Sequence, residues 1–100
     1  MTEQQTKIQA HFNKLLADKY PMLQPIDKWK QVMWHQDGDL VVSLVLLQKK
    51  VKFCFFNSSN LTLNKTQRWG TTITSENLEV ENGEAVDWKM IEMLLKNMLD

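Results

Sequence analysis

The sequence predicts an α+β protein in which a helix at each end of the chain packs on one face of an antiparallel sheet. Helical periodicities over residues 3–19 and 88–99 flank a central run of alternating or fully apolar strand patterns. Asp37-Gly38 lies within that run and suits a tight type I′ hairpin turn, because both central residues of this turn need a positive φ. The order of elements predicts a two-layer α/β sandwich with four or five strands.

Composition predicts one domain, residues 1–100. Apolar residues make up 43% of the chain and include four Trp and four Phe, enough for one core. The formal net charge is zero, which gives no general attraction to nucleic acid or membranes. Cys54 is the only cysteine, so we expect no intramolecular disulfide and no paired-cysteine metal site. Without a signal-peptide core or a membrane-length apolar run, the expected location is cytoplasmic.

Residues 3–19 have the periodicity of an amphipathic helix. Its apolar stripe consists of Ile8, Phe12, Leu15 and Leu16. Thr2 and Thr6 are alternative caps for its start. The following segment PMLQP, residues 21–25, predicts a stiff and non-helical connection, because proline ends a helix. His11, at the edge of the stripe, is expected to be an ordinary half-exposed side chain.

Three strands are predicted in succession, over residues 28–35, 39–47 and 51–56. The second is apolar on both faces, which is typical of a central strand that is covered on part of its second side. One face is predicted to hold Leu40, Val42, Leu44 and Leu46, and the other Val41, Ser43, Val45 and Leu47. Cys54 is expected to be a small core residue, since no arranged group beside it would activate a thiol.

The last third of the chain is predicted to end in a strand, a turn and a helix. Residues 57–60 (NSSN) are turn-like, residues 61–63 (LTL) suit a short strand, and residues 64–70 (NKTQRWG) read as a polar loop. β-Branching over 71–74 favours an edge strand. Leu78 to Glu81 alternates apolar and acidic residues, and Asn82-Gly83 turns the chain. Asp87 is the predicted N-cap of the final helix. The core-facing stripe of that helix consists of Trp88, Ile91, Leu94, Leu95 and Met98.

The string KYPMLQPIDKWKQVMWHQDGDLVVSLVLLQKKVKF resembles the core of the small bacterial YdhG-like family, a domain of largely unknown function with a frataxin-like fold. The family pattern has a Lys-Tyr-Pro helix exit, a Trp that opens a strand, a Gly-containing turn and a Lys-rich turn between apolar strands. These features match Lys19-Tyr20-Pro21, Trp29 with Trp34, Gly38, and Lys49-Lys50. The tail LEVENGEAVDWKMIEML is similar to the final strand, turn and helix of the family, whereas Val32 stands where the family usually has Pro.

This resemblance implies an iron-binding accessory protein. Some frataxin-like proteins are described as iron chaperones that pass weakly bound iron to iron–sulfur or haem assembly proteins, and iron prefers oxygen and imidazole ligands. Frataxins carry many acidic residues on the first helix, where this chain has only Glu3 and Asp18.

The candidate iron ligands form two groups. Glu79 and Glu81 share the outward face of one strand, and the other acidic residues of the first group, Glu76, Glu84 and Asp87, are near in sequence. A charged strand that resists self-pairing, plus a helix cap, is the alternative reading of these carboxylates. The second group surrounds the hairpin turn and consists of His35, Asp37 and Asp39, although turn formation alone also explains both aspartates.

The alternative function is a metal-free protein-interaction or small-ligand-binding module, monomeric or weakly dimeric, with exposed anchors at Trp34, Trp69 and Met93. No enzyme is expected, because the sequence has no glycine-rich phosphate loop, no HExxH motif and no nucleophile elbow. Nucleic-acid binding is not expected either, since the chain has one arginine and no net charge. The basic residues that would serve it are Lys49, Lys50, Lys52, Lys65 and Arg68.

Overall fold

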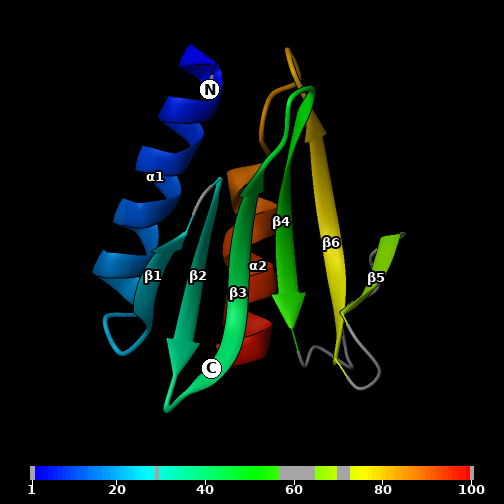
Figure 1. The fold of residues 1–100 in the computed structure, drawn as a ribbon. Coiled ribbons are helices and arrows are strands. Elements are labelled where there is room, and N and C mark those ends of the chain that lie inside the picture. Colours follow the sequence, from blue (N-terminus) through cyan, green and yellow to red (C-terminus); the bar gives the residue numbers. More distant parts are fainter. Residues whose placement is uncertain (1, 29, 57–64, 70–72, 100) are drawn as a thin grey trace.

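The computed structural model describes residues 2–28, 30–56, 65–69 and 73–99. Within these residues the chain forms two helices and six strands, whose arrangement is drawn in Figure 1. In chain order they are α1 (Glu3–Lys19), β1 (Gln24–Lys28), β2 (Gln31–Gln36), β3 (Asp39–Leu46), β4 (Lys50–Phe56), β5 (Lys65–Trp69), β6 (Ile73–Glu81) and α2 (Trp88–Leu99). The predicted α+β class is therefore confirmed, but the predicted number of four or five strands is too low for the described residues. The predictions for residues 57–64 lie outside the described residues.

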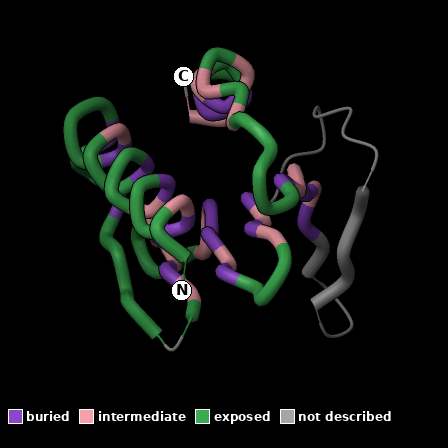
Figure 2. The backbone as a smooth tube through the Cα atoms, turned by 90° about the horizontal axis from the view of Figure 1, so that it is seen from above, coloured by how far each residue is buried: buried purple, intermediate pink, exposed green. Residues whose placement is uncertain are grey.

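The described strands form one antiparallel sheet in the order β1-β2-β3-β4-β6-β5. Both helices lie on the same side of this sheet, as the view from above shows (Figure 2). Their buried side chains join those of the central strands in one hydrophobic core. The largest fully buried side chains of that core are Phe12, Phe53, Phe55, Leu16, Leu44, Ile91 and Leu95.

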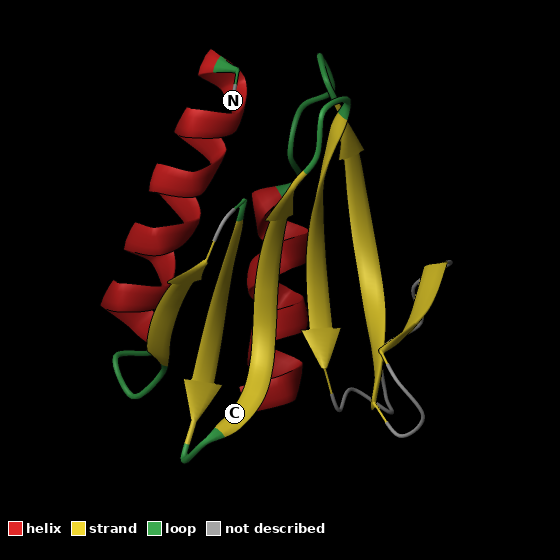
Figure 3. Ribbon diagram, viewed as in Figure 1, coloured by secondary structure: helices red, strands yellow, loops and turns green. Residues whose placement is uncertain are grey.

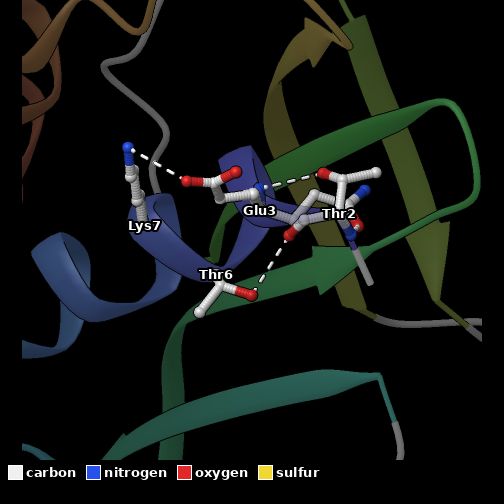
Figure 4. Close-up of polar contacts among 5 residues, drawn as sticks. Thr2, Glu3, Thr6 and Lys7 are labelled. Carbon is white, nitrogen blue, oxygen red and sulfur yellow. Dashed lines mark hydrogen bonds and ion pairs between the residues drawn. The ribbon is translucent and has the colours of Figure 1, made fainter.

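The start of α1 is fixed by a capping box. The Thr2 hydroxyl accepts a hydrogen bond from the Gln5 backbone N–H (3.1 Å), and the Gln5 side chain accepts one from the Thr2 N–H (3.2 Å). The Thr6 hydroxyl also donates to the Thr2 carbonyl (3.1 Å), and Glu3 pairs with Lys7 one turn later (Figure 4). Of the two alternative caps, Thr2 is the one used.

The first turn of α1 is also tied to two distant loops. The side chain of Gln4 donates to the Glu84 carbonyl (2.8 Å) and accepts from the Gly83 N–H (2.9 Å). The buried side chain of Gln5 donates to the Leu47 carbonyl (2.6 Å). Two adjacent glutamines therefore join the N-terminus to the loops after β3 and after β6.

The hairpin between β2 and β3 has the predicted type I′ geometry, with φ of 52° at Asp37 and 85° at Gly38. The predicted strand 28–35 is wrong at its start. Lys30 has a φ of 58° and lies in a turn, β2 begins at Gln31, and Lys28 belongs to β1. Residues 24–28 therefore form a strand that the sequence did not predict, paired along its length with β2 (Figure 3).

A β-bulge changes the predicted faces of β3. Trp34 pairs with Val42 but His35 pairs with Leu40, so Val41 is an extra residue without a partner in the ladder. Val41 packs against the core together with Val42, whereas strict alternation placed these two side chains on opposite faces. The remaining alternation holds, since Val42, Leu44 and Leu46 are buried.

The C-terminal third follows its prediction except at β5 and β6. The polar loop predicted over 64–70 is wrong at residues 65–69, which form β5 because they pair along their length with β6. Within the described residues β6 lies between β4 and β5, so the segment predicted as an edge strand over 71–74 contributes Ile73 and Thr74 to an inner strand. The turn is confirmed, with Gly83 at a φ of 93°. Asp87 Oδ1 accepts from the Met90 N–H (3.1 Å), which confirms the helix cap. Along α2, Ile91, Leu94 and Leu95 are buried, while Trp88 and Met98 are half-buried.

Candidate cleft between helix 1 and the sheet edge

An open cleft of about 560 Å³ lies between the C-terminal half of α1 and the β1–β2 edge of the sheet. It exists because Pro21 ends the helix and the Leu23 N–H bonds back to the Tyr20 carbonyl (3.0 Å), which returns the chain alongside α1 as β1. The residues that line the cleft are Asn13, Leu16, Ala17, Pro21, Leu23, Pro25, Asp27, Val32 and Trp34.

The strand register explains which residues of β1 face the cleft. Pro25 is paired with Trp34 and Asp27 with Val32, so both lie on the side of the sheet that carries the helices. Trp34 and Val32 are buried there, at 2% and 4% exposure, but every residue of β1 is exposed. The helix-facing side of the outermost strand is therefore left open.

The cleft has an apolar floor and an apolar rim. Leu16, Leu23, Val32 and Trp34 form the floor and expose only small fractions of their surface. Ala17, Pro21 and Pro25 are exposed and form the rim. The indole of Trp34 is held edge to face by Phe12, with ring centroids 5.0 Å apart. A bound molecule would therefore contact mostly rim atoms, above a floor that packing keeps rigid.

Among the described residues of this lining, Asp27 and Asn13 are polar, and Asp27 carries the one formal charge. Lys28 follows Asp27 but is paired with Gln31, so alternation directs it to the opposite face of the sheet. Sequence reasoning did not single out Asn13 or Asp27. The two prolines that flank Leu23 were the only local signal of a stiff segment here.

The predicted acidic ligands on β6 are divided between the two faces of the sheet. Glu79 and Glu81 share a face as predicted, but each lies directly opposite a lysine of β4, with Lys52 across from Glu79 and Lys50 across from Glu81. Lys50 also donates a hydrogen bond to the Glu79 carboxylate. Glu76 is paired with Phe55 and so lies on the helix-facing side.

The remaining acidic candidates of this group have local structural roles. The Glu84 carboxylate accepts from the Glu81 N–H (2.8 Å) in the turn, and Asp87 caps α2. Within the ranges that the structure describes, no three His, Cys, Asp or Glu side chains are grouped so that they could hold a metal ion. Iron binding by Glu76, Glu79, Glu81, Glu84 and Asp87 stays a prediction.

At the hairpin, Asp37 and Asp39 line a small cleft of about 270 Å³ with the end of α2, and His35 is not among its lining residues. His35 lies instead between Gln24 of β1 and Leu40 of β3 in the sheet register. Its Nδ1 is buried and has no hydrogen-bond partner among the described residues. Metal binding by these three residues also stays a prediction.

The three predicted interaction anchors have different outcomes. Trp34 is only 2% exposed, so its prediction as an exposed anchor is wrong, because its strand faces the core and Phe12 covers it. Met93 is 56% exposed on α2 and borders a groove with Lys19, Glu92 and Lys96. The side chain of Trp69 lies outside the described residues.

Cys54 is a core residue, as predicted. It is fully buried in β4 opposite Ser43, which is also fully buried. Burial raises the pKa of its thiol to about 11. A thiol with this pKa is protonated at neutral pH, so Cys54 has the character of a packing residue rather than a nucleophile.

The fold and the cleft define a small α+β protein with an open, mostly apolar cleft at a sheet edge. No protein-family model, curated protein or solved structure matches the chain. Membership of the YdhG-like family therefore stays a prediction. None of the helices in the described ranges has the length and apolar character needed to cross a membrane.

Proposed function

We propose that the protein is a non-catalytic binding module that holds a small ligand in the cleft between α1 and the β1–β2 edge. The observation that carries the proposal is the combination of volume and lining. A volume of about 560 Å³ falls within the range of small-molecule sites, roughly 300–1,000 Å³. Such sites are mostly apolar and have a few polar groups that orient the ligand, as Asn13 and Asp27 do here.

The frame of the cleft supports binding with little rearrangement. Pro21 and Pro25 have fixed φ angles, and the floor is part of the close-packed core. The conformational entropy lost on binding is small when the site is already ordered. A rigid site favours a small ligand over a long flexible chain, which would have to lose its own freedom along an exposed strand.

The resemblance to the YdhG-like family belongs to the same proposal. The two terminal helices on one face of an antiparallel sheet support a frataxin-like arrangement. Iron delivery by the β6 carboxylates is a separate prediction of that resemblance. The lysines opposite Glu79 and Glu81 already supply positive charge there, so the cleft gives the better supported site.

Ala17→Leu tests the proposed function. Ala17 is exposed on α1 and lines the cleft, so a leucine there fills the cleft while keeping a good helix former. Ala10→Leu is the matched control, because Ala10 is exposed on the same helix two turns earlier and does not line the cleft. Equal thermal stability of the two variants would establish that both fold.

The probes are phenylbutanol, phenylbutylamine and phenylbutyrate, which share one apolar body and differ in charge. We expect at least one of them to shift the amide signals of the cleft residues in a saturable manner. Binding should weaken at least about fivefold in Ala17→Leu and remain unchanged in Ala10→Leu, since about 1 kcal/mol of lost contact corresponds to that ratio. The proposal is overturned if no probe shifts these signals, or if both variants bind alike.

A further inference from the structure

We infer that the cleft selects organic cations, that is, amines or guanidines joined to an apolar body. This inference rests on the proposed function and names the ligand class for the same site. It follows from the charge of the lining. Asp27 carries a negative charge, and no described residue of the lining carries a positive one. A cleft lined by one sign of charge favours ligands of the opposite sign.

The charge of Asp27 is not neutralised from within the described part of the chain. Asp27 forms no ion pair with any described cation. Its neighbour Lys28 is directed to the other face of the sheet by strand alternation. On the facing helix, the cleft lining contributes Asn13, Leu16 and Ala17, of which none is charged. A ligand cation would therefore meet this carboxylate without displacing a cation from the described part of the chain.

The apolar part of the ligand is placed by the positions of Pro25 and Asp27. These residues are two apart on the same face of β1, so their Cα atoms are roughly 6–7 Å apart. Pro21 and Pro25 belong to the apolar rim, and Pro25 lies directly opposite Trp34 in the sheet register. Asp27 lies opposite Val32 toward the end of β1. This spacing fits a ligand whose cationic group is several bonds from a flat or branched apolar group.

Asn13 adds a second polar contact from α1. Its amide can both donate and accept, so it suits an amine or a hydroxyl equally and does not select for charge. Asp27 as an ionised carboxylate only accepts. Charge selectivity in this cleft therefore depends on Asp27. The single substitution Asp27→Asn tests the effect of this charge on binding separately from the effect of the cleft's shape.

The test compares dissociation constants for the three phenylbutyl probes in the wild type and in Asp27→Asn. In the wild type we expect phenylbutylamine to bind about threefold more tightly than phenylbutanol, the range of an exposed ion pair, and phenylbutyrate to bind most weakly. In Asp27→Asn the amine and the alcohol should bind equally. Raising the salt concentration should reduce the preference of the wild type for the amine.

Asp18→Asn is the matched control. Asp18 is an exposed aspartate next to Ala17, but it borders a different groove with His11 and Lys14. Its removal changes the net charge by the same amount and should leave the amine preference intact. If it removes the preference as fully as Asp27→Asn does, a general charge effect explains the data and the inference is wrong.

The outcomes separate the inference from the proposed function. Equal binding of amine and alcohol to the wild type overturns the selection of cations and leaves the cleft as a binding site. Failure of all three probes overturns the proposed function itself. An aspartate that only protects the edge of the sheet would show increased self-association in Asp27→Asn with unchanged amine preference, and this result also overturns the inference.

Discussion

The imidazole ring of His11 lies flat on the indole ring of Trp88, with ring centroids 3.8 Å apart and ring planes 10° apart. His11 is in the middle of α1 and Trp88 is the first residue of α2. Trp88 also lies against Phe12 and Phe53, at centroid distances of 6.3 Å and 5.9 Å. The Trp88 side chain thus connects both helices to the centre of the sheet. His11, which the sequence predicts to be an ordinary half-exposed side chain, covers this tryptophan.

His11→Ala should lower the free energy of unfolding by about 1 kcal/mol, the size of an aromatic pair beyond its buried area. Trp88→Ala should cost more, about 3 kcal/mol, because it also removes packing against Phe12 and Phe53. Urea denaturation of both single variants and the double variant gives the coupling energy. Lys14→Ala on the exposed side of α1 is the control, and a coupling energy near zero would contradict the stacked contact.

Gly38→Ala should destabilise the protein by about 1–2 kcal/mol through the backbone alone. Gly38 has a φ of 85°, and an added Cβ would meet no atom within 4 Å. Gly83→Ala, at a φ of 93° and in equally open space, should cost a similar amount. Asp37→Asn should leave stability unchanged or slightly raised, because Asn-Gly is the preferred type I′ pair. Chemical denaturation measures all three, and a neutral Gly38→Ala variant would argue against the turn geometry.

Glu79→Gln should lower the free energy of unfolding at neutral pH. The hydrogen bond from Lys50 to the Glu79 carboxylate is the main cause that raises the pKa of Lys50 above its ordinary 10.5. A base with a raised folded-state pKa contributes its full stabilisation below the unfolded-state pKa and loses it as the pH rises through the folded-state value. The difference between Glu79→Gln and wild type should therefore shrink above pH 10.5.

The control for this prediction is Glu3→Gln. Glu3 pairs with Lys7 at 3.6 Å on the first helix, with side chains 87% and 77% exposed, compared with 13% and 33% for Glu79 and Lys50. Exposed ion pairs contribute little to stability, so Glu3→Gln should lower the free energy of unfolding less than Glu79→Gln does. Urea denaturation at neutral and alkaline pH compares the two variants. Equal losses of unfolding free energy would show that the Lys50–Glu79 pair stabilises the protein no more than the exposed Glu3–Lys7 pair does.

The Cys54 thiol should not react with a disulfide reagent in the native protein at slightly alkaline pH, and should react fully in denaturant. Burial raises its pKa from an ordinary 9.0 to about 11. Above 9.0 the unfolded state loses this proton while the folded state keeps it, so stability falls as the pH rises toward about 11. Cys54→Ala should remove part of that alkaline loss. Rapid native-state labelling would contradict the burial of the thiol.

Ferrous iron tests the prediction that follows from the family resemblance. If Glu79 and Glu81 bind Fe²⁺, anaerobic titration should broaden the amide signals of residues 76–87, while binding at the hairpin should broaden those of residues 35–39. Lys50→Met should then strengthen binding at β6, because it removes the cation paired with Glu79. The double variant Glu79→Gln/Glu81→Gln is the control. Unmoved signals at millimolar iron would contradict iron binding at both places.

The parts of the fold that the sequence predicts well are those with local signals. Helix 3–19 and helix 88–99 have strong apolar periodicity and side-chain caps, and the structure confirms both with the predicted bounds. Asp37-Gly38 is confirmed as well, because positive φ has a strong residue preference. Each of these features is determined by residues that are close together in the sequence.

The parts that the sequence misses are decided by pairing across the sheet. All five residues of β1 are exposed, so the segment has no alternation of buried and exposed residues from which a strand could be predicted. It is a strand because it pairs with the free edge of β2. The bulge at Val41 follows from how β3 meets β2, and it has no residue signature. Asp27 belongs to no motif, and its place in the cleft depends on the unpredicted strand.

The two glutamines at the start of α1 give the folding of this chain a particular order. Gln4 bonds to groups at residues 83 and 84, and Gln5 to a carbonyl at residue 47. During synthesis the residues of α1 leave the ribosome well before residues 83 and 84, which fix its N-terminal turn to the Gly83 loop. Contacts of such long sequence separation form slowly. The N-terminal turn of α1 is therefore fixed to the Gly83 loop later than the apolar side of the helix can pack on the central strands, because Phe12 contacts Trp34 and Phe53.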